Sequence, residues 1–384
     1  MSRKTIKELF VELYERYHRA SKELKSGILN ELCATTHYNR KYAIRKLNGP
    51  PPDTAPASRP ARRRGLTYSV HVLDVLTQVW AAAGYPCGVR LKAFLTVWRP
   101  RIQERFSLTV GEIQQLFAIS PRQIDRRLAA QKRALKKRLY GRTQPGTLLK
   151  HQIPIKTTHW DVHQPGFHEM DTVAHCGNSA DGLFGYTVNQ TDILTGWVES
   201  QAILGKGEQA VVAALDAMRA ACPFTTHGYD SDNGSEFLNW HLLRYCDHQQ
   251  IQPTRSRPYK KDDNAHIEQK NWTHVRKLVG YLRYDTVEAV AAMNDLYRQD
   301  LRVFMNVFVP SMKLIKKERV GSRLRRRYDV PQTPLDRVLA SQQGDPRKVA
   351  ALLRLRETLD PFTLAATIDR KVHRIAALAR GQTS

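Results

Sequence analysis

The chain has 384 residues and a large basic excess, with 61 lysines and arginines against 36 aspartates and glutamates and a net charge of +25. This excess favours a polyanionic partner, nucleic acid before membrane, and the length allows roughly two to four domains. No apolar run approaches the ~20 residues of a membrane-spanning helix, and the first residues lead into no apolar signal core. The five cysteines are scattered without a C-x-x-C pair, which favours reduced cytosolic thiols over disulfides or a structural zinc site.

Residues 1–49 are expected to form a helix-turn-helix domain. Apolar residues recur at helical spacing near the start of the chain and again between residues 25 and 34. After a polar break at residues 35–37, a third helix interleaves apolar and basic side chains. A helix, a short break and a basic helix form the outline in which the last helix lies in the major groove, so Arg40 and Arg45 are candidate DNA contacts. A plain helical packing module has the same outline and remains the alternative.

Residues 50–66 are expected to be a linker, because they are rich in Pro and Ala, show no periodicity and end in three arginines. Arg62, Arg63 and Arg64 are candidate DNA contacts, either to phosphates or in the minor groove. The alternative is a solvated spacer.

Residues 67–150 predict a second helical DNA-binding domain. Apolar periodicity indicates two helices over residues 70–83 and 89–106. Residues 109–112, Thr-Val-Gly-Glu, have the form of a capping box, which opens a third helix.

The last helix of this region is the better candidate for a recognition helix. Ser120-Pro121 supplies an N-cap hydroxyl followed by Pro at the first helical position, and the helix is expected to continue over residues 122–138. Arg122, Arg126 and Arg127 are its candidate DNA contacts. A basic, solvated helix remains the alternative.

Residues 155–310 alternate between strand and helix signals in the order β, β, β, α, β, α, β, α. The expected strands cover residues 167–176, 184–192, 197–203, 229–232 and 251–256, and helices are expected over 208–221 and 237–248. A further helix is expected to begin at Asp285-Thr286-Val287-Glu288 and to end near Pro310.

Residues 311–384 form a basic C-terminal region. Its densest basic run includes Arg325, Arg326 and Arg327, which are candidate phosphate contacts. Helical patterning resumes over residues 333–381, whereas the fold of the basic run cannot be read from the sequence.

Three acidic residues occupy distinctive positions in the 155–310 region. Residues 228–237 read as a strand that runs into the turn dipeptide Asn233-Gly234, so Asp232 lies at the carboxyl end of a strand, where open α/β sheets bind ligands and metals. Asp171 lies in another strand-like run, and Glu268 lies in the first turns of a helix. Sixty residues separate the two aspartates, and 35 separate Asp232 from Glu268.

Two strand-end aspartates and a helical glutamate after a 35-residue gap resemble the acidic triad of DDE transposases and retroviral integrases. The likeness covers residues 155–310 and includes the runs Ser231-Asp232-Asn233-Gly234 and Ser256-Arg257-Pro258-Tyr259. Two positions depart from the retroviral pattern, since Ala265 replaces a glycine and Val275 replaces a basic residue.

The resemblance implies an α/β fold with a ribonuclease H-like core, a five-stranded mixed sheet flanked by helices, preceded by the all-α helix-turn-helix domains. It implies that Asp171, Asp232 and Glu268 are both the catalytic residues and the ligands of two Mg²⁺ ions, with Mn²⁺ as an alternative. Asp171 would bridge the two ions. The implied partner is double-stranded DNA, as element ends and target, bound by a homo-oligomer in the bacterial cytoplasm.

Neighbouring acids compete with this assignment, because an isolated acid in a strand or loop is usually solvated or part of a turn. Asp230 shares a strand face with Asp232, but only Asp232 adjoins the turn. Glu169 faces the same side as Asp171 and is a candidate supporting residue.

Three carboxylates suit phosphodiester cleavage and transfer, in which two cations activate the nucleophile and stabilise the leaving oxygen. Together with the resemblance, this chemistry predicts a DNA transposase that cleaves the ends of a mobile element and joins the 3′-hydroxyls to target DNA. Two alternatives remain open, a metal-dependent nuclease on the same core that does not join, and a DNA-binding regulator with an idle core.

Overall fold

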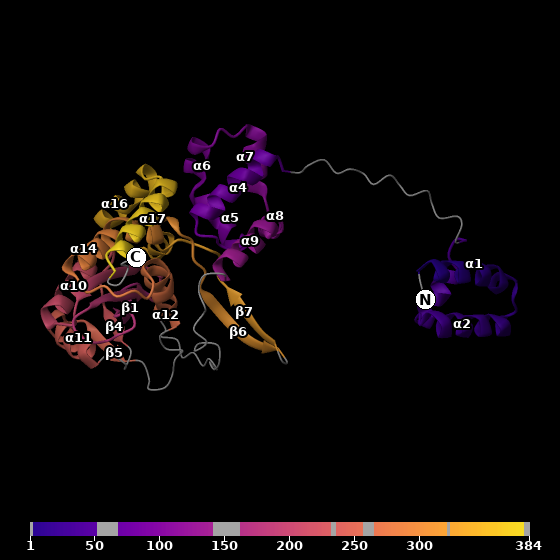
Figure 1. Ribbon diagram of the computed structural model, residues 1–384, viewed down its shortest axis with the longest axis horizontal. Coiled ribbons are helices and arrows are strands. Elements are labelled where there is room, and N and C mark those ends of the chain that lie inside the picture. Colours follow the sequence, from indigo (N-terminus) through magenta and orange to yellow (C-terminus); the bar gives the residue numbers. More distant parts are fainter. Residues whose placement is uncertain are drawn as a thin grey trace. The chain divides into compact units, whose positions relative to one another are not determined.

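The computed structural model describes residues 3–51, 68–140, 162–231, 236–255, 265–320 and 323–379 (Figure 1). The linker arginines Arg62, Arg63 and Arg64 lie outside the described residues, as does Asp232 with the turn that follows it. By its internal contacts the chain divides into two compact units, residues 1–67 and residues 68–384.

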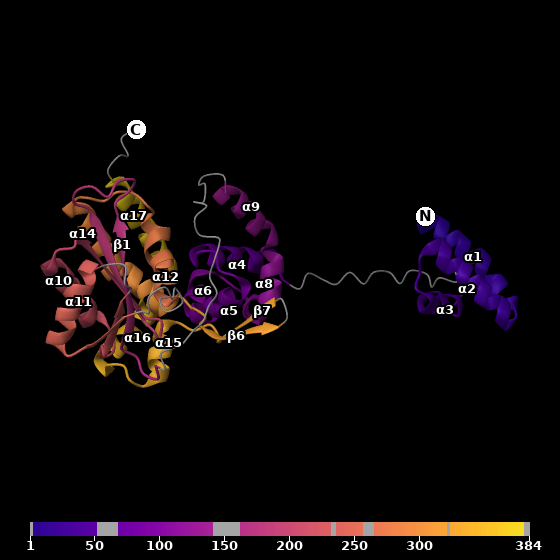
Figure 2. The same cartoon turned by 90° about the horizontal axis from the view of Figure 1, so that it is seen from below.

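The described part of the first unit is a helical bundle (Figure 2). Its helices are α1 (Arg3–Arg19), α2 (Lys22–Thr36) and α3 (Arg40–Leu47). Asn39 caps α3 by accepting a hydrogen bond from the backbone N–H of Lys41 at 3.0 Å. Leu13, Leu32 and Leu47, one from each helix, are fully buried in a common core. The predicted helix pattern is confirmed, and its role as a helix-turn-helix stays a prediction.

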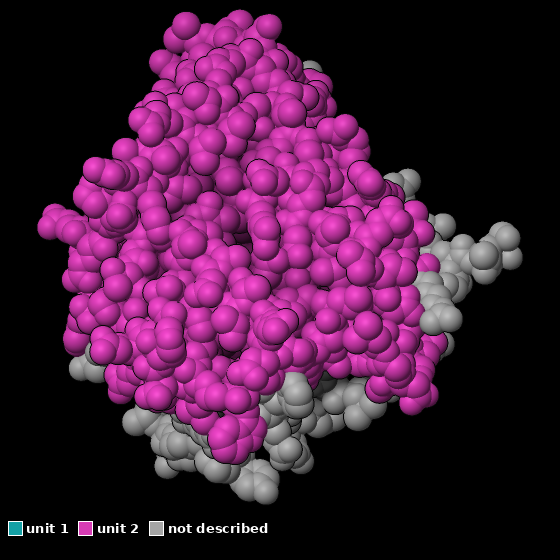
Figure 3. Space-filling model, turned by 90° about the vertical axis from the view of Figure 1, so that its left-hand side faces the viewer, with its two compact units in different colours: residues 1–67 teal, residues 68–384 magenta. Residues whose placement is uncertain are grey.

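The second unit begins with a run of helices, and Figure 3 shows one face of this unit. The helices are α4 (Val70–Ala82), α5 (Gly88–Val97), α6 (Arg99–Arg105), α7 (Val110–Ala118), α8 (Pro121–Arg127) and α9 (Ala129–Tyr140). The expected single helix over residues 89–106 is wrong, because Pro100 has no N–H for an intrahelical bond and therefore begins a new helix, α6. The next long helix that we expected breaks at Leu128, where the sequence has neither Pro nor Gly. Both predicted N-termini are confirmed, since Thr109 forms a capping box and Ser120 caps α8.

The centre of the second unit is a five-stranded mixed sheet with strand order β3-β2-β1-β4-β5. Its strands are β1 (Phe167–His175), β2 (Gly185–Asp192), β3 (Val198–Leu204), β4 (Gly228–Ser231) and β5 (Gln252–Arg255). The first three strands are antiparallel, β4 is parallel to β1 and β5 is parallel to β4. The predicted order of strands and helices is confirmed, and this arrangement is consistent with a ribonuclease H-like core.

The two faces of the sheet are covered by different helices. Helices α10 (Glu208–Ala221) and α11 (Glu236–Gln249) form the two parallel crossovers and pack with Met170 and Val188 on one face. Successive side chains of a strand point to opposite faces, so Glu169, Asp171 and Val173 belong to the other face.

That second face is covered by a helical run after β5. Its elements are α12 (Ala265–Lys270), η1 (Asn271–Arg276), α13 (Lys277–Val279), α14 (Val287–Asp295), η2 (Leu296–Leu301) and η3 (Phe304–Phe308), where η denotes π-helix. Thr286 caps α14 by accepting a hydrogen bond from the Ala289 backbone N–H at 3.1 Å. The predicted helical end near Pro310 is confirmed. Helix α12 contacts β1 and β2, and η1 contacts β1.

The C-terminal region contains a second sheet and further helices. Strands β6 (Leu314–Val320) and β7 (Arg323–Tyr328) form an antiparallel pair of their own, followed by α15 (Pro334–Ser341), α16 (Pro346–Thr358) and α17 (Pro361–Ala377). The basic run whose fold the sequence left open is therefore β-structured.

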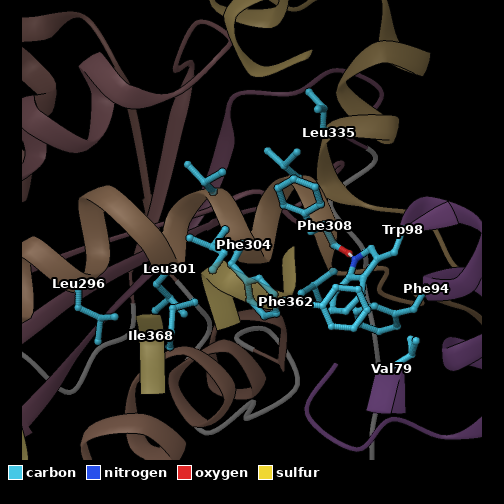
Figure 4. Packing of buried hydrophobic residues seen from close by; sticks show 14 of the residues in the cluster. Val79, Phe94, Trp98, Leu296, Leu301, Phe304, Phe308, Leu335, Phe362 and Ile368 are labelled. Atoms are coloured by element: carbon cyan, nitrogen blue, oxygen red, sulfur yellow. Dashed lines mark hydrogen bonds between the residues drawn. The ribbon is translucent and has the colours of Figure 1, made fainter. Parts of the chain in front are cut away.

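The N-terminal helices of the second unit share a core with its C-terminal part (Figure 4). The indole Nε1 of fully buried Trp98 donates a hydrogen bond to the backbone oxygen of Phe308 at 2.9 Å. The rings of Trp98 and Phe362 pack edge to face with centroids 5.1 Å apart. Helices that precede the sheet and helices that follow it are thus held together by apolar packing.

Candidate functional site

Asp171 lies in the middle of β1 and not at a strand end, as we had expected, because β1 continues to His175 in its pairing with β2. Its carboxylate is held from two sides. Its Oδ1 accepts a hydrogen bond from the Thr172 backbone N–H at 2.7 Å. Its Oδ2 accepts one from the side-chain amide of Asn271 at 2.6 Å. These two hydrogen bonds fix the orientation of the carboxylate. The side chain is half-buried, so it remains accessible from solvent.

Asn271 is itself held by a chain of polar side chains on the same sheet face. Its Oδ1 accepts from the Nδ2 of Asn189 at 2.8 Å, and the Oδ1 of Asn189 accepts from the hydroxyl of Ser200 at 2.8 Å. Because the oxygen of Asn271 is engaged by Asn189, its NH₂ group is directed at Asp171. Asn189 is fully buried and pairs directly with Asp171 across β1 and β2. Sequence reasoning missed this chain of side chains.

Helix α12, together with Asn271, the first residue of η1 directly after it, is attached to β1 at two points on either side of Glu268. Glu169, buried to 3% exposure, accepts a hydrogen bond through Oε2 from the backbone N–H of Ile267 at 2.9 Å. Asn271, three residues after Glu268, contacts Asp171 as described. Residues three apart in a helix share a face, so the two contacts bring exposed Glu268 to the sheet face that carries Asp171. Glu169 was expected to support the site, and it does so by docking this helix.

The third predicted acid, Asp232, lies outside the described residues, and Ser231 before it is the last residue of β4. Strand β4 runs parallel to β1 with Ser231 paired with Met170, the residue before Asp171. Asp230 is buried in the sheet, and its Oδ1 accepts from the hydroxyl of Thr254 at 3.1 Å.

Among the described residues, which do not include Asp232, no group of three His, Cys, Asp or Glu side chains is arranged to hold an ion. The two described members, Asp171 and Glu268, offer hard oxygen donors of the kind that Mg²⁺ prefers.

Two basic residues that follow Glu268, Lys270 and His274, have side chains that are partly or fully buried. Lys270 is half-buried and donates to the backbone oxygen of Gly196 at 3.4 Å, and burial, with nearby Arg337 and Arg90, lowers the pKa of Lys270 to about 8. Burial also lowers the pKa of His274 well below its usual range.

The position at which the retroviral pattern has a basic residue is part of the core. Val275 is fully buried. Next to it, Arg276 stacks over the ring of Tyr281 at 4.6 Å, and Lys277 is exposed. If this part of the helix contacts DNA, the basic side chain exposed for that contact is Lys277 and not residue 275.

The two predicted DNA contacts of the first unit, Arg40 and Arg45, differ in how firmly other side chains of the protein hold them. The guanidinium of Arg40 donates to the side-chain oxygens of Asn30 and Ser26, the latter at 2.8 Å, and is thus tied to α2. Arg45 is exposed and lies over the ring of Tyr42 at 5.5 Å. Of the two, Arg45 is the more accessible to a phosphate.

The predicted DNA contacts of the second unit are all exposed, on α8 and β7. They are Arg122, Arg126, Arg127, Arg325, Arg326 and Arg327. The carboxylate of Asp125 accepts from the Gly88 backbone N–H at 3.0 Å, which docks α8 on the start of α5. Ile124 points into the core, so the exposed side of α8 presents its arginines to solvent. Within the described residues, no helix is long and apolar enough to cross a membrane.

Comparison with known proteins places the chain in a family. No protein-family model matches it. The uncharacterized protein y4rM of Sinorhizobium fredii (strain NBRC 101917 / NGR234) is 36% identical over 340 residues, which span 88% of this chain and 96% of that protein. The chain belongs to the family of y4rM.

Two solved structures resemble parts of the chain. One is a chain of the simian T-cell lymphotropic virus intasome in complex with PP2A regulatory subunit B56 gamma, with 16% identity, a TM-score of 0.28 and coverage of 34% of this chain and 45% of that one. The other is the catalytic core domain of BIV integrase, with 20% identity, a TM-score of 0.29 and coverage of 46% of this chain and 95% of that one. TM-scores this low add nothing to the fold assignment, which rests on strand order and direction.

Proposed function

We propose that this protein is a DNA transposase with an integrase-type core, which cleaves the ends of a mobile DNA element and joins their 3′-hydroxyls to target DNA. The observation that carries the proposal is the double attachment of α12 to β1, through Ile267 to Glu169 and through Asn271 to Asp171. It brings Glu268 to the face that carries Asp171, at the level where β4 ends. The net charge of +25 suits a DNA substrate, on which the protein would act as a homo-oligomer.

The carboxylates of Asp171, Asp232 and Glu268 fit a pair of Mg²⁺ ions. Mg²⁺ binds oxygen ligands and is held by few carboxylates together with substrate phosphates. When bound, two such ions activate the attacking oxygen and stabilise the leaving oxygen of an in-line displacement. Asp171 would bridge the pair, and Asp232 and Glu268 would each hold one ion.

The remaining chemistry needs no side-chain nucleophile. A water oxygen attacks phosphorus at the element end, the bond to O3′ breaks, and the leaving oxygen takes a proton to become a free 3′-hydroxyl. That hydroxyl then attacks a target phosphodiester, breaking one phosphorus–oxygen bond as it forms another. Asn271 orients the Oδ2 of Asp171, and Glu169 holds the helix that carries Glu268.

A strand-transfer assay with element-end duplexes, target DNA and Mg²⁺ tests the proposal. We expect Asp171→Asn, Asp232→Asn and Glu268→Gln each to abolish cleavage and joining while DNA binding persists, because only metal ligation is lost. Asp230→Asn is the matched control, since that carboxylate is engaged with Thr254 in the sheet, and it should retain both activities.

Each failure of this assay has a distinct meaning. Cleavage without joining would support the nuclease, and binding without cleavage in the unmodified protein would support the regulator. Full activity of Asp232→Asn together with loss in Asp230→Asn would move the second metal ligand to Asp230.

A further inference from the structure

The pair of strands β6 and β7 forms a two-stranded ribbon, and all of its described side chains except that of Leu314 are exposed to solvent. Figure 1 draws the ribbon apart from the five-stranded sheet, and the two sheets share no strand. Glu318 is its single acid, and its basic residues are Lys316, Lys317, Arg319, Arg323, Arg325, Arg326 and Arg327. Tyr328, at the end of β7, is 47% exposed. The side chains that the structure describes along β7, from Leu324 to Tyr328, are all exposed.

The strand register distributes the positive charge over both faces of the ribbon. Lys316 pairs with Arg327, and one position further Lys317 pairs with Arg326. Directly opposed residues share a face and successive positions alternate, so the two like-charged pairs belong to opposite faces. Glu318, which is opposite Arg325 and forms an ion pair with Lys316, offsets part of the charge on one of them. Like charges placed opposite one another destabilise a pair of strands, and an isolated hairpin is marginal in water. A partner that supplies negative charge to both faces removes this repulsion.

The base of the ribbon is fixed to the catalytic sheet. Lys313 donates through Nζ to the backbone oxygens of Ile193 and Leu194, at 2.8 and 2.7 Å, in the turn between β2 and β3. Arg337, 8% exposed, donates through Nη2 to Asp329 at 2.9 Å and to the Ser311 backbone oxygen at 2.7 Å. The ribbon therefore leaves the sheet from a buried, hydrogen-bonded base, which sets its direction.

We propose that the β6–β7 ribbon is an arm that enters the major groove of duplex DNA. The major groove of B-form DNA is wide enough to admit a two-stranded ribbon, whose edges are flanked there by phosphates of both DNA strands. The seven residues of β6 extend ~24 Å at ~3.4 Å per residue, which matches about seven base pairs. The inference rests on the proposed function in one respect, that duplex DNA is the substrate. The narrow major groove of A-form RNA would not admit the ribbon.

The test compares two double variants of the full-length protein that lose the same charge. Arg325→Ala/Arg327→Ala removes two exposed arginines from one face of the ribbon, and Arg347→Ala/Arg354→Ala removes two exposed arginines from α16. Binding to a 30-base-pair duplex is titrated at several salt concentrations. We expect the ribbon variant to flatten the slope of log K against log salt by about 1.8, at ~0.9 per lost phosphate contact, and the α16 variant to leave it unchanged.

A second arm of the test asks which groove the ribbon occupies. The same duplex is prepared with glucosylated 5-hydroxymethylcytosine, whose sugar projects from C5 into the major groove. We expect the unmodified protein to lose more affinity for this duplex than the ribbon variant does, because the candidate recognition helices are present in both proteins and only the ribbon differs. A double-stranded RNA of equal length should bind both proteins equally.

These measurements can overturn the inference without touching the proposed function. Equal slopes for the ribbon and α16 variants, or equal losses of affinity for the glucosylated duplex by the unmodified protein and the ribbon variant, would show that the ribbon is not in the major groove. Joining activity would then still stand on its own assay. Conversely, binding to DNA can be measured with Glu268→Gln, so a failure of the proposed chemistry leaves this test intact. Thermal unfolding and Arg325→Lys/Arg327→Lys, which keeps the charge, exclude misfolding as the cause of a loss.

Discussion

Replacing Asn271 by Leu removes the amide that orients Asp171 while keeping a side chain of similar size. The lost bond joins Nδ2 of Asn271 to a carboxylate oxygen at 2.6 Å. Hydrogen bonds to charged groups contribute about 1.5–3 kcal/mol, which corresponds to roughly 10- to 150-fold in a rate. A partner that orients a metal ligand typically changes metal affinity by ~10–100-fold. We therefore expect the joining rate at limiting Mg²⁺ to fall by about one to two orders of magnitude.

The assay for Asn271→Leu is strand transfer as a function of Mg²⁺ concentration, with the rate normalised to folded protein. Asn294→Leu is the matched control, because Asn294 also bridges a helix to the sheet through two hydrogen bonds, to the backbone N–H and oxygen of Ala202, at 2.7 and 2.9 Å. Both variants leave a polar partner unsatisfied and should lose a similar ~1–3 kcal/mol of stability. Only Asn271→Leu should raise the Mg²⁺ concentration at half-maximal rate.

The reasoning is refuted if Asn271→Leu joins DNA at the unmodified rate and with the unmodified Mg²⁺ dependence. It is refuted equally if Asn294→Leu shows the same shift, since the effect would then come from general loss of stability.

Two further predictions concern stability. Glu169→Gln should lower the free energy of unfolding by about 1 kcal/mol, because it keeps an acceptor for the Ile267 N–H but removes its charge. Glu169→Ala removes the acceptor and should lower the free energy of unfolding by about 1–3 kcal/mol. Urea unfolding measures both losses, and equal losses would contradict the contact between Glu169 and Ile267. Burial lowers the pKa of His168 to about 4 and that of His175 to about 3. Their folded pKa values lie below the unfolded value, so the stability they contribute is complete above pH ~6.5 and is lost as the pH falls toward 4. Each histidine should lower the free energy of unfolding by roughly 2 kcal/mol between pH 7 and pH 5. His168→Phe should therefore make the free energy of unfolding depend less steeply on pH, and an unaltered dependence would refute this role of His168.

The five-stranded sheet could be predicted from the sequence because local signals and tertiary structure agree there. Each of strands β1 to β5 contains a β-branched or aromatic residue, and the turn at Thr195 and Gly196 joins β2 to β3 as expected. Helix ends with side-chain caps, such as Thr109, were also predictable. The break at Leu128 was not, because no local residue marks it and its buried side chain indicates that packing decides.

The candidate site could be predicted only in part, for a physical reason. The acids Asp171 and Glu268 were found from their spacing, and Asp232 remains a prediction from the same spacing. The supporting amides Asn189 and Asn271 come from different elements, and their contact is created by the docking of α12 on the sheet. The one local signal was the position of Asn271, one helical turn after Glu268. Pairing of β6 with β7 was likewise hidden, because both strands are dominated by charge rather than by alternation of apolar and polar residues.

In the proposed transposase, the shared core of the second unit would link DNA recognition to catalysis. Trp98 donates to the backbone of Phe308, and Arg90 donates through Nε to the backbone oxygen of Pro310 at 3.0 Å. Protein interiors are close-packed and change shape little, so α8, which docks on α5, holds a fixed position relative to the sheet. An arginine such as Arg122 that contacts a base would then also set which phosphodiester reaches Asp171. In such an arrangement the length of DNA between the recognised sequence and the cleaved bond would be determined by the protein core, because α8 docks on α5 and Trp98, which follows α5, is bonded to Phe308 of η3.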